Sequence, residues 1–157
     1  MQREIERKFL VKNTLFLHEE GIADKIEIVQ GYISKEDRKI VRIRRTNSLM
    51  HESTHGKLTL KLKPVADVDA GVDEFEYDIP EDEAAKILEN CTDPLIEKIR
   101  YVIEYKNTLW EVDVFHGHKL GLVLAEVELQ NENDPIDIPE WIGEEVTGKS
   151  EFYNANM

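Results

Sequence analysis

Several short segments of the chain carry two charges of the same sign at positions i and i+2. These pairs are Glu4/Glu6 followed by Lys8, Arg42/Arg44, Lys61/Lys63, Glu74/Glu76, Lys98/Arg100, Glu111/Asp113 and Glu126/Glu128. Residues two apart in a β-strand share a face and lie about 6.5 to 7 Å from each other. Each pair would therefore project two like charges from one side of a strand, where they repel unless counter-charges lie between them.

The two signs are segregated along the sequence, with cations and acids on different predicted strands. Guanidinium and ammonium groups bind phosphate oxygens, whereas carboxylates supply the oxygen ligands that Mg²⁺ or Mn²⁺ prefers. If these faces meet in one cavity, it would suit a polyanion together with a hard metal ion. The alternative is a set of solvated outer faces with cross-strand Lys/Glu ladders worth about 0.2 to 1 kcal/mol per pair. The segregation favours the cavity, because solvated faces mix signs more.

The elements that would position these charges are mostly strands. Period-two alternation predicts about eight of them, at residues 3–11, 26–34, 38–46, 57–64, 71–79, 96–106, 108–116 and 122–130. Turn signals lie at 47–56 and at Lys106-Asn107, a helix is predicted over 80–90, and shorter helices over 14–20 and 136–145. Closed into an antiparallel barrel, the strands would turn apolar faces outward and charges into a wet tunnel.

Length and composition set the broad class. A chain of 157 residues with 41% hydrophobic and 34% charged residues suits one soluble domain over residues 1–157. The longest apolar run, 120–125, is far shorter than a membrane helix, and the charged start lacks a secretory apolar segment, so we expect a cytoplasmic protein. A net charge of −13 argues against nucleic acid or an anionic membrane as partner, but does not exclude a small anion.

Other reactive or aromatic residues have simpler interpretations. His116 and His118 flank a glycine in a predicted turn, which is more typical of a polar loop than of a metal site. Cys91 follows a predicted helix end without a neighbouring histidine signature, so packing is favoured over nucleophilic chemistry. Trp110 and Trp141 could stack on a ligand ring, but core packing is the more ordinary role.

The segment Glu4-Ile5-Glu6-Arg7-Lys8 resembles the ExExK signature of the CYTH superfamily, the triphosphate tunnel metalloenzymes. Further segments match in order: Val41-Arg42-Ile43-Arg44, Leu58-Thr59-Leu60-Lys61-Leu62-Lys63, Glu74-Phe75-Glu76, Lys98-Ile99-Arg100-Tyr101, Glu111-Val112-Asp113-Val114-Phe115, Ala125-Glu126-Val127-Glu128, and Glu145-Val146-Thr147 with Tyr153-Asn154. The resemblance spans the chain nearly end to end. It implies a mainly β, α+β fold: an eight-stranded antiparallel barrel with a few flanking helices.

The resemblance also implies roles for individual residues. Catalytic roles fall to Glu4, Glu6 and Lys8; metal binding to Glu4, Glu6, Asp113, Glu126 and Glu128; phosphate binding to Lys8, Arg42, Arg44, Lys61, Lys63, Lys98 and Arg100. Lys149 stands slightly before the place where many bacterial relatives have an arginine, and is a weaker phosphate candidate. Glu74 and Glu76 are candidates for orienting the cations through ion pairs.

The function that follows is hydrolysis of a triphosphate with Mg²⁺ or Mn²⁺, with inorganic tripolyphosphate as the first choice because many compact bacterial relatives act on it. A class IV-type adenylate cyclase or a thiamine triphosphatase on the same fold remains open. So does a non-catalytic sensor of polyphosphate or nucleotide, although a pure binder has less need for so many carboxylates. The expected partner is a small triphosphate, and a homodimer is left open.

Overall fold

The strands of the computed structural model account for most of the chain, and residues 5–63, 73–91, 93–131 and 133–157 are described. The strands are β1 (Ile5–Val11), β2 (Ile22–Glu36), β3 (Lys39–Ser48), β4 (Ser53–Leu62), β5 (Asp73–Ile79), β6 (Ile96–Tyr105), β7 (Thr108–His116), β8 (Val123–Leu129) and β9 (Ile142–Glu145). The helices are α1 (Glu81–Glu89) and the 3₁₀ turns η1 (Leu15–His18), η2 (Gly117–Lys119), η3 (Ser150–Phe152) and η4 (Asn154–Asn156). The eight predicted strands and the helix at 80–90 are confirmed.

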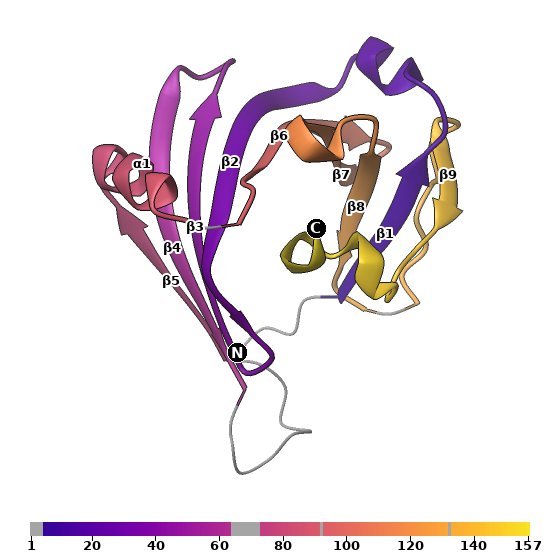
Figure 1. The fold of residues 1–157 in the computed structure, drawn as a ribbon. Helices are drawn as coiled ribbons and strands as arrows, with labels where there is room; N and C mark the ends of the chain where they lie inside the picture. Colours follow the sequence, from indigo (N-terminus) through magenta and orange to yellow (C-terminus); the bar gives the residue numbers. More distant parts are fainter. Residues whose placement is uncertain (1–4, 64–72, 92, 132) are drawn as a thin grey trace.

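All nine strands form one antiparallel sheet in the order β5-β4-β3-β2-β6-β7-β8-β1-β9. The sheet curls into a deep arc, with β5 near one end and β9 at the other (Figure 1). The predicted class, a mainly β, antiparallel fold with a few flanking helices, is confirmed, but the sheet is not closed, because no ladder joins β5 to β9 within the described residues. Closure depends on contacts between distant strands, and a local period-two pattern carries no information about them.

The helix predicted over 136–145 is wrong. This segment instead ends in the short strand β9, which pairs with β1, and the backbone N–H of Val146 donates to the carbonyl of Lys8. Pro139 and Gly143 both disfavour a helix interior, since proline removes a backbone donor and glycine costs backbone entropy. The predicted helix at 14–20 is reduced to the single 3₁₀ turn of η1.

The predicted turns are present. Lys106 and Asn107 have positive φ angles of 45° and 64°, which suits a two-residue connection between β6 and β7. The β3–β4 connection is shorter than the predicted loop 47–56, because the strands continue to Ser48 and resume at Ser53.

The two faces of the sheet have opposite character. Apolar residues on the convex face form two clusters, one beneath α1 around Ile43 and Leu88, and one around Trp110 and Trp141. The charged residues of the paired motifs within the described strands share the concave face, according to the strand registers. The C-terminal turns η3 and η4 fold toward the same face (Figure 1). The outward apolar and inward charged faces expected of a tunnel are therefore present, although the sheet is open.

A third cluster closes one end of the concave face. Phe152 and Met157 from the C-terminal segment pack against Phe115, Leu124 and neighbouring apolar residues there. Among the described residues, no helix is long and apolar enough to cross a bilayer.

Candidate functional site

Strand register brings the charged residues of distant segments together on the concave face. Lys8 of β1 lies opposite Glu126 of β8, and Arg100 of β6 lies opposite Asp113 of β7. Lys61 of β4 is likewise opposite Glu74 of β5. Since antiparallel partners point to the same side of a sheet, these three pairings join charges of opposite sign, whereas Glu6 with Glu128 and Glu111 with Glu126 join like charges.

Asp113 is the centre of the densest of these contacts. Its Oδ2 lies 2.8 Å from Lys98 Nζ and accepts from Arg100 Nη2 at 3.0 Å, while its Oδ1 accepts from Arg100 Nε at 2.8 Å. Arg100 also pairs with Glu111, with 2.6 Å between Nη1 and Oε2. Both oxygens of Asp113 are therefore engaged with cations.

Burial opposes the charge on each of Asp113, Lys98 and Arg100, and each charge is favoured by the opposite charge beside it. Burial alone would favour a neutral Asp113, but Lys98 and Arg100 hold its pKa well below the usual range. Burial lowers the pKa of Lys98 to about 8, against the opposing influence of Asp113. Burial also disfavours the charge on Arg100, yet Asp113 keeps the pKa of the guanidinium raised. The two cations therefore keep Asp113 ionised despite its burial.

Lys8 joins the acidic strand β8 to the C-terminal segment. Its Nζ lies 3.1 Å from Glu126 Oε1, donates to the carbonyl of Phe152 at 3.0 Å, and sits 5.3 Å from the ring centre of Tyr153. Lys98 makes a second contact with this segment, because its Nζ donates to Asn154 Oδ1 at 3.3 Å. The C-terminal turns thus touch two of the predicted phosphate ligands.

The arginines on β3 have a different environment. Arg44 donates through Nε and Nη2 to Oε1 of Gln30, at 2.8 and 2.6 Å, and Arg42 Nη2 donates to Thr59 Oγ1 at 3.1 Å. Arg42 Nε is buried and has no hydrogen-bond acceptor within the described residues. Burial, followed by the charges of Arg42 and Arg100, lowers the pKa of Arg44 to about 10.

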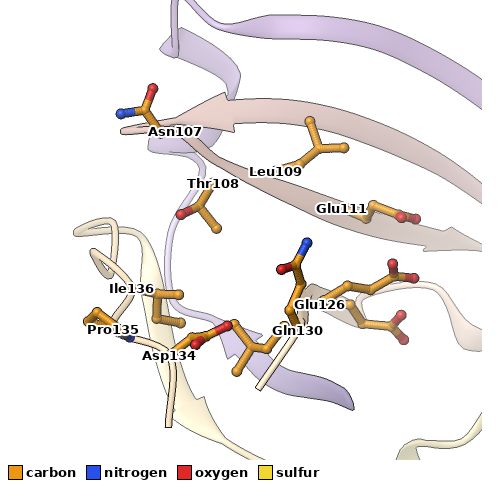
Figure 2. A pocket seen from close by; sticks show the side chains of 11 residues that line it. Asn107, Thr108, Leu109, Glu111, Glu126, Gln130, Asp134, Pro135 and Ile136 are labelled. Carbon is orange, nitrogen blue, oxygen red and sulfur yellow. The ribbon is translucent and has the colours of Figure 1, made fainter. Parts of the chain in front are cut away.

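An acidic cavity of about 980 Å³ opens beside β7 and β8. Glu111 and Glu126, from adjacent strands, lie directly opposite each other, and Figure 2 shows their side chains together at one side of this cavity. Glu128 and Asp134 also line it. Because these acids come from two strands and a following loop, their meeting depends on the register of β7 with β8.

Sequence patterns missed three contributors to the concave face. Gln30 and Thr59 are fully buried and hold the two arginines, but neither is charged, so a search for charge pairs passes over them. Lys57 pairs with Glu76, with 3.4 Å between Nζ and Oε2. Lys57 alternates with Thr59 and Lys61 in the sequence, and this period-two pattern could have added Lys57 to the predicted site. Glu111 was noted as in phase with the charged faces, but was not included among the predicted site residues.

The remaining predicted residues are more peripheral. Glu6 and Glu128 face each other across β1 and β8, whereas Glu4 lies outside the described residues. Lys63 follows β4 and pairs with Asp37 at 3.6 Å, and Lys149 pairs with Glu144 at 3.2 Å, both largely exposed. Roles for Lys63 and Lys149 in phosphate binding therefore stay predictions.

Histidine and tryptophan follow their simpler interpretations. His118 is exposed and lies 3.3 Å from the backbone oxygen of Met157, and Trp110 and Trp141 are fully buried in the convex core. Within the described part of the chain, no three His, Cys, Asp or Glu side chains are grouped tightly enough to hold a metal ion. The carboxylates of the cavity therefore line its wall without forming a preformed metal-binding site.

A curled antiparallel sheet that gathers cations and carboxylates on its concave face defines a protein suited to a small polyanion. The family comparison agrees: the model of the CYTH domain family matches residues 2–155. The chain belongs to the CYTH domain family.

Named relatives are similar over nearly the whole chain. An inorganic triphosphatase of Acetivibrio thermocellus is 40% identical, covering 100% of this chain and 94% of its own length. An inorganic triphosphatase of Nitrosomonas europaea is 31% identical, covering 98% of this chain and 95% of its own. The solved structure of the inorganic triphosphatase NE1496 has a TM-score of 0.72 at 30% identity, covering 99% of this chain and 94% of that one.

Proposed function

We propose that this protein hydrolyses inorganic tripolyphosphate to phosphate and pyrophosphate on the concave face of its sheet. The observation that supports this most strongly is the pair of β3 arginines held by neutral acceptors, which leaves positive charge available on the same concave face that carries the cavity acids. The two inorganic triphosphatases at 40% and 31% identity support the choice of substrate.

The chain's own cations would bind and orient the triphosphate. Arg42 and Arg44 present guanidinium groups, which suit phosphate oxygens because their donors form a planar fork. Lys8, near the acidic strands, would act on the phosphoryl group closest to the cavity. Together these residues neutralise charge that builds on phosphate oxygens as the bridging bond breaks, which is the main catalytic demand of phosphoryl transfer.

The cavity acids fit a divalent metal by chemistry. Carboxylate oxygens are the donors that Mg²⁺ and Mn²⁺ prefer, and Glu126 and Glu128, with Glu6 of the neighbouring strand, are the described residues that would supply them. These three side chains do not form a ready-made ligand group, so they would have to draw together around the ion. When bound, such an ion would neutralise phosphate charge and make a bound water more acidic. Glu4, from the same ExExK segment, is the further predicted ligand.

The other acids have more specific roles. Asp113 already accepts from two cations, so we assign it to positioning Lys98 and Arg100 rather than to metal binding. Glu111 pairs with Arg100 and faces the cavity, so it can align an attacking water or restrain that arginine. In the hydrolysis, water oxygen attacks the terminal phosphorus, the bridging P–O bond breaks, pyrophosphate leaves, and the water's proton passes to a carboxylate and then to solvent.

Organic triphosphates are the second candidate class. A cyclase or thiamine triphosphatase needs a surface for the ring of its substrate, and neither tryptophan can provide it, because both are buried on the convex side. The inorganic substrate is favoured over a nucleotide or thiamine triphosphate by the two relatives named inorganic triphosphatase.

Product analysis tests the proposal directly. The purified protein would be incubated with tripolyphosphate, ATP or thiamine triphosphate and Mg²⁺ or Mn²⁺, with Glu126→Gln as the blank. We expect phosphate and pyrophosphate from tripolyphosphate, lost in the variant. Cyclic AMP with pyrophosphate from ATP would establish the cyclase alternative instead. Phosphate release that survives both Glu126→Gln and Glu4→Gln would contradict the proposed site.

A further inference from the structure

Gln30 is an unusual partner for the arginine it holds. It belongs to β2, lies directly opposite Arg44 of β3, and its side chain is fully buried. Arginine has only donors, so the amide oxygen must face the guanidinium, and it accepts from Nε and Nη2 at 2.8 and 2.6 Å. The amide nitrogen then points the other way and donates to the hydroxyl of Tyr32 at 3.3 Å. Each polar atom of the buried amide has a partner.

The same geometry would accept glutamate without rearrangement. A carboxylate oxygen would receive the two Arg44 hydrogens, and Tyr32 could reverse its hydroxyl and donate to the second oxygen. A charged acceptor would also make these hydrogen bonds stronger, since bonds to ionised groups are about twice as strong as neutral ones. The strength of these hydrogen bonds therefore favours glutamate, partly offset by the cost of burying its charge, yet the chain has the neutral isostere.

The hydrogen-bond partner of the neighbouring Arg42 is neutral as well, and Glu76, an acid that interacts with this arginine, is already paired with Lys57. Arg42 is held by the hydroxyl of Thr59, which is also fully buried. Tyr32 lies opposite Arg42, and its burial raises the pKa of the phenol against the charges of Arg42 and Arg44, so the hydroxyl stays protonated. Gln30, Tyr32 and Thr59 thus satisfy hydrogen bonds without cancelling positive charge.

We propose that Gln30 is a positioning residue that fixes the Arg44 guanidinium for an incoming phosphate group while leaving its positive charge unneutralised. The inference rests on the proposed function, because it assigns Arg44 to the bound triphosphate. A carboxylate at position 30 would hold Arg44 equally well but compete with the substrate for its charge. The amide gives up local stability in exchange for anion affinity, a trade that is common at binding sites.

Gln30→Glu separates positioning from packing, because it preserves shape and hydrogen bonds while adding one negative charge. Asn47→Asp is the matched control: it makes the same amide-to-carboxylate change on β3, at a position whose side chain contacts Thr54. Asn47 lies an odd number of residues from Arg44, so it projects from the opposite face of the sheet. Gln30→Leu removes the acceptor altogether.

The measurement is equilibrium binding of tripolyphosphate without metal at several salt concentrations, together with Tm, kcat and KM. We expect Gln30→Glu to keep or raise the wild-type Tm, to weaken binding about tenfold or more at low salt, and to raise KM much more than it lowers kcat. Its binding should also depend less on salt, since the anion meets one less net charge. Asn47→Asp should match wild type, and Gln30→Leu should lower both Tm and affinity.

Two outcomes would overturn the inference in distinguishable ways. If Gln30→Glu binds within twofold of wild type while Arg44→Met loses affinity, the phosphate site stands and the role of Gln30 in preserving charge is wrong. If wild-type protein binds no tripolyphosphate and releases no phosphate from it, the proposed function is wrong. The proposed role of Gln30 is then wrong as well.

Discussion

The concave face has two regions that hold their cations by different means. On β6, β7, β8 and β1, Lys8, Lys98 and Arg100 each contact at least one carboxylate at 3.1 Å or less. On β2, β3 and β4, Arg42 and Arg44 are held by a hydroxyl and an amide. We call these the carboxylate region and the neutral region.

This difference indicates that cations of similar burial can have different roles in the two regions. In the carboxylate region the charges stabilise one another and the sheet, and removing one member exposes its partner to the full cost of burial. In the neutral region the arginines are held by neutral acceptors, and Arg42 Nε has no acceptor among the described residues, so an external anion gains the attraction of their charge. The first region is suited to fixing geometry and the second to binding substrate.

The largest expected effect on stability lies in the carboxylate region. Asp113→Asn should lower the free energy of unfolding by about 3 to 5 kcal/mol, because Lys98 and Arg100 lose the carboxylate that compensates their burial. Denaturant unfolding monitored by circular dichroism measures this. Arg44→Met, in the neutral region, should cost no more than about 1 to 2 kcal/mol, since it removes hydrogen bonds to a neutral amide. Equal losses in the two variants would erase the distinction.

Acid should weaken the carboxylate region selectively. Because the pKa of Asp113 in the folded protein is held below its ordinary value of 3.8, the unfolded chain takes up its proton first as the pH falls. The stabilisation from Asp113 is therefore complete above about pH 5 and is lost as the pH drops through and below 3.8. Unfolding free energies from pH 6 to 3 should fall more steeply for wild type than for Asp113→Asn. Parallel slopes would show that Asp113 does not depend on its cations for ionisation.

The smallest effect should come from an ion pair outside both regions. Arg7 and Glu145 lie 2.7 Å apart between Nη2 and Oε1, but both side chains are about a third exposed. Glu145→Ala should cost about 0.2 to 1 kcal/mol in low salt and almost nothing in 1 M salt. A cost above about 2 kcal/mol would mean that short distance, rather than burial and hydrogen-bond context, decides the value of these pairs.

Local alternation identified the charged residues of both regions as sharing a strand face, but not the neutral partners of the two arginines. Charge pairs two residues apart identified Lys98, Arg100 and Asp113, since period two assigns such residues to one strand face whatever the fold. Gln30 and Thr59 carry no charge, and their importance appears only when β2 and β4 are aligned with β3. Sequence spacing contains no register, so it could not identify them.

The overall shape was predictable only in part, for the same reason. Eight strands and their antiparallel hairpins follow from alternation and turn residues such as Asn107. Whether the sheet closes depends on its edges, and β9 is only four residues long, so its alternation is too brief to recognise. The two prolines before it, Pro135 and Pro139, exclude a helix in retrospect, but they do not indicate which strand the segment will join.

The claim that the reaction takes place on the concave face is tested most directly by comparing two neighbouring arginines on opposite faces of β3. Arg44 lies on the concave face and is held by Gln30, whereas Arg45 lies on the convex face and pairs with Glu81 of α1. We would measure phosphate release from tripolyphosphate with Mg²⁺ or Mn²⁺ for Arg44→Met and Arg45→Met. We expect kcat/KM to fall about a hundredfold for Arg44→Met and less than threefold for Arg45→Met, because only Arg44 offers its charge to the substrate. Similar activities in the two variants would contradict the claim that the reaction takes place on the concave face.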